Sequence, residues 1–326
     1  MGICFQQAKL LWKARLRGVS FNETATIAHL RLFLHSRERS WLQTAFKAEF
    51  GDSTLNPLAN YRFGEFSDEF FHQVLGASSI AALDYSSYEG ANTIQDLNQP
   101  IGDELRSRFD AVIDGGSLEH IFNFPVAIAN LMKMLKVGGT MFLCTAANNL
   151  CGHGFYQFSP ELMFRIFTEE NGFTSCRVIL SEARFPSVEK TSDRAAYEAH
   201  DPATVGGRIG LVSRHPVEMM VEARKVEDLP LFRCPLVQSD YVVQWNESLG
   251  RSKDRGPRVM LRHAFDKLPR FCDTECWGIG NSGNSLLRIR GLTRSSRSNG
   301  PESGNWEFRA TSETGVLARL PGERIA

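Results

Sequence analysis

Residues 109–139, FDAVIDGGSLEHIFNFPVAIANLMKMLKVGG, contain the feature that most constrains the fold. A short apolar run ends in an acidic, glycine-rich turn, and a helical pattern follows at once. Four apolar residues of that pattern recur at i, i+3, i+4 and i+7, so they share one face of a helix. They are Ile128, Leu131, Met132 and Leu135. A strand, a turn and a helix in this order form the repeating unit of an α/β fold, whose strands are buried beneath helices.

The same alternation continues on both sides of this segment. Apolar runs at 78–84 and 91–96 predict strands, and the run 140–146 predicts a central strand that is covered on both faces. Helical patterns occupy 35–51, 66–77 and 159–172, and the segments 173–180, 207–213 and 217–226 are expected to supply the last strands. This order predicts an α/β protein with a doubly wound, mostly parallel sheet.

Three segments of different composition follow one another along the chain. Residues 1–20 are interpreted as an N-terminal extension, and residues 21–245 carry the strand–helix alternation. Residues 246–326 are rich in Gly, Ser, Asn and Arg and show no sustained period, which is typical of a poorly ordered C-terminal tail. A chain cut after residue 245 is therefore expected to remain a folded domain.

Composition limits which classes of binding partner and which cellular compartment are expected for this protein. The 37 Lys and Arg residues balance the 37 Asp and Glu residues, so net charge indicates neither a nucleic-acid nor a membrane partner. The first residues contain no apolar run of the length of a signal or a membrane span. Seven cysteines, an odd number, suit a reducing compartment. The expected localisation is cytoplasmic, and the oligomeric state is left open.

Three acids, Asp84, Asp96 and Asp114, stand at or just after three predicted strand ends. In an open parallel sheet, ligands bind beyond the carboxyl ends of the strands, where the strand order reverses. An ionised carboxylate only accepts hydrogen bonds, which suits a ribose diol or an exocyclic amine. Each acid could equally cap the next helix. Three acids at successive strand ends favour a nucleoside-binding site over helix caps alone.

These segments resemble the class I S-adenosylmethionine-dependent methyltransferases. Residues 109–139 are similar to the fourth-strand region of that family, with its acid, turn, "LEH" helix and Leu-Lys-Val-Gly-Gly corner. Residues 83–101 resemble the second and third strands. Residues 153–173 and 238–245 resemble a bacterial branch that is often linked to polysaccharide or other secondary biosynthesis. The resemblance covers roughly residues 20–245 and implies a Rossmann-like methyltransferase fold that binds S-adenosylmethionine.

The resemblance also implies roles for single residues at the adenosine end of the cofactor. Asp84 would bind the ribose hydroxyls, while Asp96 and Leu97 would face the adenine. The family's first strand runs into a glycine-rich turn, but the corresponding residues 27–30 of this chain, Ile-Ala-His-Leu, contain no glycine. A Cβ at Ala28 strains any turn that requires a positive φ.

At the methionine end, the resemblance implies that Asp114, Gly115 and Gly116 line the cofactor. Glu119 is a separate candidate for binding the amino group of the cofactor. The two glycines also have a physical rationale of their own, because a missing Cβ lets the backbone approach a ligand closely. A solvated helix position is the alternative interpretation of Glu119.

Methyl transfer from a sulfonium is an in-line displacement, in which a base helps when the acceptor is a hydroxyl or an amine. His153, in a glycine-flanked loop, and His120 are the candidate bases, and packing against the helix is the alternative for His120. Tyr156 and Gln157 are candidates for orienting the acceptor. Phe155 and Phe158 are expected to form a hydrophobic wall.

No metal site is expected, because the C-x3-C pair Cys272 and Cys276, with His263 nearby, has no second pair. The leading functional hypothesis is S-adenosylmethionine-dependent methyl transfer to a small-molecule or sugar-derived oxygen or nitrogen. The alternative is a catalytically degenerate protein of the same fold that acts as a scaffold in a biosynthetic pathway. A nicotinamide-dependent oxidoreductase is disfavoured, because no G-x-G-x-x-G opens the sheet.

Overall fold

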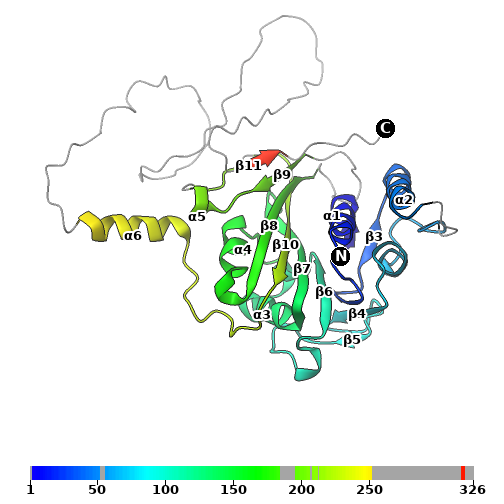
Figure 1. Ribbon diagram of the computed structural model, residues 1–326, viewed down its shortest axis with the longest axis horizontal. Coiled ribbons are helices and arrows are strands. Elements are labelled where there is room, and N and C mark those ends of the chain that lie inside the picture. Colours follow the sequence, from blue (N-terminus) through cyan, green and yellow to red (C-terminus); the bar gives the residue numbers. More distant parts are fainter. Residues whose placement is uncertain are drawn as a thin grey trace, which may run out of the picture.

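The computed structural model describes residues 2–51, 56–183, 195–205, 208–211, 213–251 and 317–319. Within these residues, nine strands form one sheet in the order β11-β9-β8-β10-β7-β6-β2-β4-β5. Helices cover both faces of the sheet (Figure 1). The expected doubly wound α/β fold class is confirmed, with a mixed sheet in which four of the described strand pairs are parallel and four are antiparallel.

The parallel half of the sheet contains five strands, and β2 lies inside it. They are β2 (Glu23–Ile27), β4 (Ser79–Asp84), β5 (Thr93–Ile94), β6 (Phe109–Gly115) and β7 (Leu135–Asn148). From β2 the chain proceeds outward through β4 to β5, then returns to the other side of β2 and continues through β6 to β7. The strand order therefore reverses between β2 and β6, so the switch point lies at the carboxyl ends of these two strands.

The other half of the sheet is antiparallel. β10 (Val217–Lys225) lies between β7 and β8 (Phe173–Glu182) and runs antiparallel to both. β9 (Ala196–Ala199) and β11 (Leu317–Arg319) extend this edge. The predicted strands 173–180 and 217–226 are confirmed. The prediction of a strand at 207–213 is wrong, because the described residues of this segment, 208–211 and 213, lie outside any strand. β9 pairs with β8 in this part of the sheet instead.

Two helices cover one face of the sheet and the N-terminal helices cover the other. α3 (Phe124–Met134) and α4 (Pro160–Ile166) pack on the first face. α1 (Phe5–Leu16), α2 (Ser36–Phe50) and the π-helical turn η1 (Phe70–Leu75) contribute to the second core. The strands alternate between the two cores: Val112 contacts the first and Ile113 the second.

The helix expected after the acidic turn is present, with a different end. Ile128, Leu131 and Met132 are buried on one face of α3, as predicted. Leu135 is also buried, but it begins β7 instead of ending the helix. The shorter elements are η2 (Asp103–Leu105), η3 (Leu118–His120), η4 (Glu169–Asn171) and α5 (Pro202–Val205).

The first residues of the chain pack into the domain. β1 (Gly2–Cys4) pairs in parallel with β3 (Arg31–Phe33), which follows the turn after β2. α1 buries Phe5, Leu11 and Trp12 in the second core. Residues that were interpreted as an extension therefore supply part of the layer that covers the sheet.

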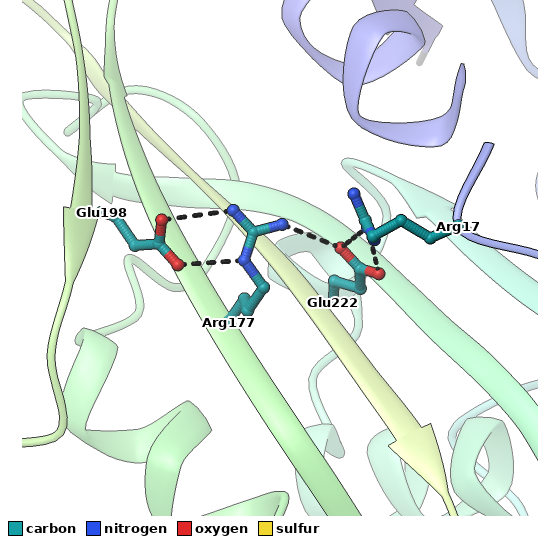
Figure 2. Close-up of polar contacts among 4 residues, drawn as sticks. All are labelled: Arg17, Arg177, Glu198 and Glu222. Atoms are coloured by element: carbon teal, nitrogen blue, oxygen red, sulfur yellow. Dashed lines mark hydrogen bonds and ion pairs between the residues drawn. The ribbon is translucent and has the colours of Figure 1, made fainter. Parts of the chain in front are cut away.

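A network of two arginines and two glutamates joins the end of α1 to three strands (Figure 2). Arg17 Nη2 donates to Glu222 Oε1 of β10 at 2.6 Å. Arg177 of β8 donates to Glu222 Oε2 at 3.3 Å and, through Nε, to Glu198 Oε1 of β9 at 2.9 Å. These bonds to Glu198 raise the pKa of Arg177, and the same bonds lower the pKa of Glu198.

α6 (Ser239–Arg251) extends away from the sheet in Figure 1. Its first residue is held by Glu161, whose Oε1 accepts from the Ser239 amide at 2.9 Å. Of the segment 246–326, the structure describes the end of α6 and β11, so the rest of the predicted tail, with Cys272 and Cys276, lies outside the described residues. No helix in the described ranges combines the length and apolar character needed to cross a membrane.

Candidate functional site

The three strand-end acids lie along one edge of the sheet. In the strand register, Ile27 is opposite Leu83 on one side and Asp114 on the other, and Asp84 is opposite Ile94. Asp96 follows two residues after Ile94. The carboxyl ends of β2, β4, β5 and β6 therefore bring Asp84, Asp96 and Asp114 to the edge at which the strand order reverses.

Asp84 and Asp96 are both half-buried, and each carboxylate binds part of its own turn. Asp84 Oδ1 accepts from the Tyr85 amide at 2.6 Å. Asp96 Oδ1 accepts from the backbone and the side-chain nitrogens of Asn98, each at 2.9 Å. The Leu97 side chain is buried in the first core and so anchors the turn of Asp96 to the domain.

Asp114 is buried and caps the turn η3. Its Oδ1 accepts from the Ser117 amide at 2.8 Å and its Oδ2 from the Leu118 amide at 3.2 Å. Burial, with a smaller contribution from the negative charge of Glu119, raises the pKa of Asp114 to about 7. The carboxyl of Asp114 therefore orders the turn at the end of β6.

The backbone after Asp114 is closely covered at Gly115. A Cβ there would lie 2.9 Å from Leu30 Cδ2 and 3.4 Å from the carbonyl oxygen of Gly2. Gly116 has a φ of +103°, in the region that only glycine adopts easily. Leu30 and β1 thus lie over the position that the family resemblance assigns to the methionine end of the cofactor.

The turn after β2 has a left-handed backbone, although the sequence places no glycine there. Ala28 is buried with a φ of 66°, and its amide donates to the Leu83 carbonyl at 2.6 Å. The ring of His29 stacks on Phe66, with the centroids 3.7 Å apart. His29 Nδ1 lies 2.9 Å from the Glu89 carbonyl, and Nε2 lies 2.8 Å from Asp68 Oδ2. His29 therefore links the first turn to the loop after β4.

An open hollow of about 450 Å³ lies next to His29. It is lined by Asn60, Arg62, Glu65, Phe66, Asp68 and Glu69. Two of these residues, Phe66 and Asp68, are the contacts of the His29 ring. Phe66 and Asp68 therefore belong both to the wall of the hollow and to the contacts of the first turn.

A second group of polar side chains forms where β6 and β7 end. Glu119 in η3 is buried, and its Oε2 accepts from the Thr145 hydroxyl of β7 at 2.8 Å. His153, in the loop after β7, lies with Nε2 3.4 Å from Glu119 Oε1. The rings of His120 and His153 meet edge to face, with centroids 4.8 Å apart. Partial burial lowers the pKa of His120, although the charge of Glu119 opposes this shift.

Aromatic side chains border this polar group. The Tyr156 hydroxyl donates to the Phe122 carbonyl at 2.7 Å, and its ring stacks on Phe158, which is buried. Phe122 and Phe155 are 74% and 69% exposed and meet at right angles. Of the two residues expected to form a wall, Phe158 belongs to the core and Phe155 stands in solvent. Gln157 accepts from the Leu150 amide at 2.9 Å and so shapes the loop.

Two contributors to this edge were missed in the sequence. Thr145 places a hydroxyl group inside an otherwise apolar strand. That polar residue in an apolar run is the sequence feature that could have indicated a role for Thr145 at the site. The His29 contacts with Phe66 and Asp68 join residues 37 and 39 positions apart, and no spacing rule indicates them.

Comparison with known proteins adds little to this geometry. The sequence matches no family model, and no curated protein is significantly similar to it. A candidate methyltransferase from Bacillus halodurans C-125 is similar to 68% of this chain over 99% of its own length, with 12% identity and a TM-score of 0.36. A Burkholderia thailandensis 1,6-didemethyltoxoflavin-N1-methyltransferase, solved with S-adenosylhomocysteine, is similar to 68% of this chain over 78% of its own length. Its sequence identity to this chain is 14%, and the TM-score is 0.33. Likenesses this distant carry no part of the functional argument.

Proposed function

We propose that this protein transfers a methyl group from S-adenosylmethionine to a small-molecule or sugar-derived acceptor. The observation that carries the proposal is the position of the first turn at the switch point of a doubly wound sheet, with Asp84 at the carboxyl end of the neighbouring strand β4 and Asp96 just after β5. This is where open α/β sheets bind nucleotide-like ligands. The half-buried carboxylate of Asp84 would accept hydrogen bonds from a ribose diol.

The acceptor would lie at the ends of β6 and β7, beside Gly116. There His153 contacts Glu119, His120 packs against His153, and Tyr156 binds the Phe122 carbonyl. The exposed rings of Phe122 and Phe155 offer faces to a planar or sugar-like molecule. The bond from the sulfonium to the methyl carbon breaks as the bond from that carbon to the acceptor oxygen or nitrogen forms. The acceptor proton leaves to this group of side chains, and S-adenosylhomocysteine is the other product.

Calorimetry with S-adenosylmethionine and with NADH tests the proposal. The wild type is expected to bind the first and not the second. Asp84→Ala is expected to weaken binding by about 10- to 100-fold, because hydrogen bonds to a charged group contribute about 1.5–3 kcal/mol. Asp103→Ala, which removes an exposed acid of η2, serves as the matched control and should leave affinity unchanged.

A scaffold without catalytic activity is the second candidate. Leu30 and Gly2 cover Gly115, and His29 is stacked in the first turn, so several protein groups occupy the edge where a cofactor would lie. If neither S-adenosylmethionine nor S-adenosylhomocysteine binds to the folded wild type, methyl transfer is refuted and the scaffold is favoured.

A further inference from the structure

We propose that Glu119, His120 and His153 bind one divalent transition-metal ion at the ends of β6 and β7. The three side chains come from two loops, and one ligand atom from each lies within 4.8 Å of the other two. Two imidazoles and one carboxylate form the donor set of many catalytic zinc and non-haem iron sites, which keep further coordination positions open. All three residues are candidates from the sequence, but the sequence does not indicate that they form one cluster, because His153 lies 33 residues after His120.

One of the ligand distances already suits a shared ion, and the others must shorten. Two ligand atoms that are each about 2.1 Å from a tetrahedral ion lie about 3.4 Å apart. Glu119 Oε1 and His153 Nε2 are 3.4 Å apart. All ligand atoms lie within 4.8 Å of one another, so the remaining pairs must approach by at most about 1.4 Å. Glu119 is held in the core, whereas the imidazoles of His120 and His153 are exposed and can rotate to close that gap.

The charge balance of the site also favours a cation. The Glu119 side chain is 2% exposed, and the buried carboxyl of Asp114 is close enough to interact with its charge. A buried carboxylate is stable when a cation compensates it. Among the described residues, the ion-pair partner of Glu119 is His153, and neither lysine nor arginine pairs with it. A divalent ion would supply the positive charge.

The surroundings hold the carboxylate in a fixed orientation. The Thr145 hydroxyl binds Oε2, which leaves Oε1 directed at His153. The Glu119 carbonyl accepts from the Phe155 amide at 2.7 Å and so ties the loop of His153 to the turn of His120. Such outer contacts orient metal ligands before the ion binds.

The role that the ion would have in methyl transfer rests on the proposed function, whereas the proposal that the ion binds here does not. An open coordination position beside the acceptor would bind a hydroxyl oxygen and lower its pKa, so that it becomes a nucleophile near neutral pH. The coordinated imidazoles would then not act as the base, and the proton of the bound hydroxyl would leave to solvent. The structure thereby favours an acceptor with a hydroxyl group that can reach a metal.

Titration of the full-length, tag-free and chelator-treated protein with Co²⁺ and Zn²⁺ tests the site. One equivalent should bind, with the visible absorption of Co²⁺ in a low-symmetry nitrogen and oxygen site, and Mg²⁺ should not compete because it prefers oxygen ligands. His120→Ala, His153→Ala and Glu119→Gln are each expected to weaken binding by at least about 100-fold. Thr145→Val, which removes an outer contact, is expected to weaken it by about 10- to 100-fold.

Two variants serve as matched controls and should bind as the wild type does. His215→Ala removes an exposed histidine outside the cluster, and Cys151→Ser removes the exposed thiol of the same loop. Absence of stoichiometric binding at about 10 µM metal, or equal binding by the folded His153→Ala variant, would overturn the proposal. In either case Glu119 and His153 contact each other without a metal ion. Calorimetry with S-adenosylmethionine then still decides the proposed function, since Asp84 is not a ligand.

Discussion

Ala28 is the residue at which the sequence and the fold disagree most directly. A left-handed conformation costs a non-glycine residue about 1–2 kcal/mol, yet Ala28 adopts it with a φ of 66°. Its methyl group is buried in the second core, which offsets part of that cost by about 0.8 kcal/mol. The turn thus has the left-handed backbone of a glycine turn, but it carries a buried methyl group.

Ala28→Gly is accordingly expected to change the free energy of unfolding by less than about 1 kcal/mol, because strain relief and the lost methyl nearly cancel. Urea denaturation measures this change. Ala8→Gly, at a buried helical position of α1, is the control and should destabilise by about 1.5–2 kcal/mol. Equal destabilisation by both variants would contradict the argument.

Asp114 gives the stability a specific pH dependence. Its pKa is raised from 3.8 to about 7 in the folded protein, so the native state binds a proton that the unfolded state has released. The stabilisation is therefore fully present below about pH 4 and is lost as the pH rises through 7. Unfolding measured in chelator from pH 4 to 8 should show this decline in the wild type and a flatter curve in Asp114→Asn. Parallel curves would contradict it.

At the scale of single elements, the charged network of Figure 2 attaches α1 to the antiparallel half of the sheet. Glu222 accepts hydrogen bonds from both Arg17 and Arg177, and its side chain is 11% exposed. The two arginines are 45% and 35% exposed, so water partly screens their charges. The network is a moderate contributor to stability, below the range of a fully buried pair.

Glu222→Gln is expected to lower the free energy of unfolding by about 1–2 kcal/mol. The loss should shrink at high salt, because screening already weakens the wild-type pair. Denaturation at low and at high ionic strength checks both points. Glu49→Gln, an exposed position of α2, should change stability by less than about 0.5 kcal/mol. A Glu222 variant that matches this control would show that the network contributes nothing.

The elements that sequence predicted well are those with an uninterrupted period. α3 and the strands β6, β7, β8 and β10 carry apolar runs or stripes that reflect their burial. β9 was missed because its sequence, AYEA, is short and its Glu198 is compensated by an arginine of the next strand. Residues 208–211 resembled a strand, but Arg208 binds Asp240 of α6 and the partly buried Ile209 packs against the core from a loop.

At the scale of the whole molecule, the order of the sheet was predictable from the alternation of elements, whereas most of the site was not. Strand-end acids follow from the topology, since parallel strands end at one edge. The contact of Glu119 with His153 depends on where a loop after β7 returns, and local pattern does not encode it. The coverage of Gly115 by Leu30 is likewise a tertiary event.

Truncation after residue 245 tests the organisation of the chain. Both cores are built from described residues that precede this point, so the shortened protein should unfold in one cooperative transition. Loss of β11 exposes the edge of β9, with an expected destabilisation of about 1–2 kcal/mol. Urea unfolding followed by circular dichroism and by fluorescence measures this. Transitions that differ between the two probes would show that the remaining residues do not fold as one unit.

The pairing of β1 with β3 has a practical consequence for anyone who handles this protein. Because the carbonyl of Gly2 faces Gly115, anything fused in front of the first residue emerges beside the candidate cofactor site. A purification handle or fluorescent reporter there could obstruct the entrance and imitate an inactive protein. Attachments are better made at the opposite terminus.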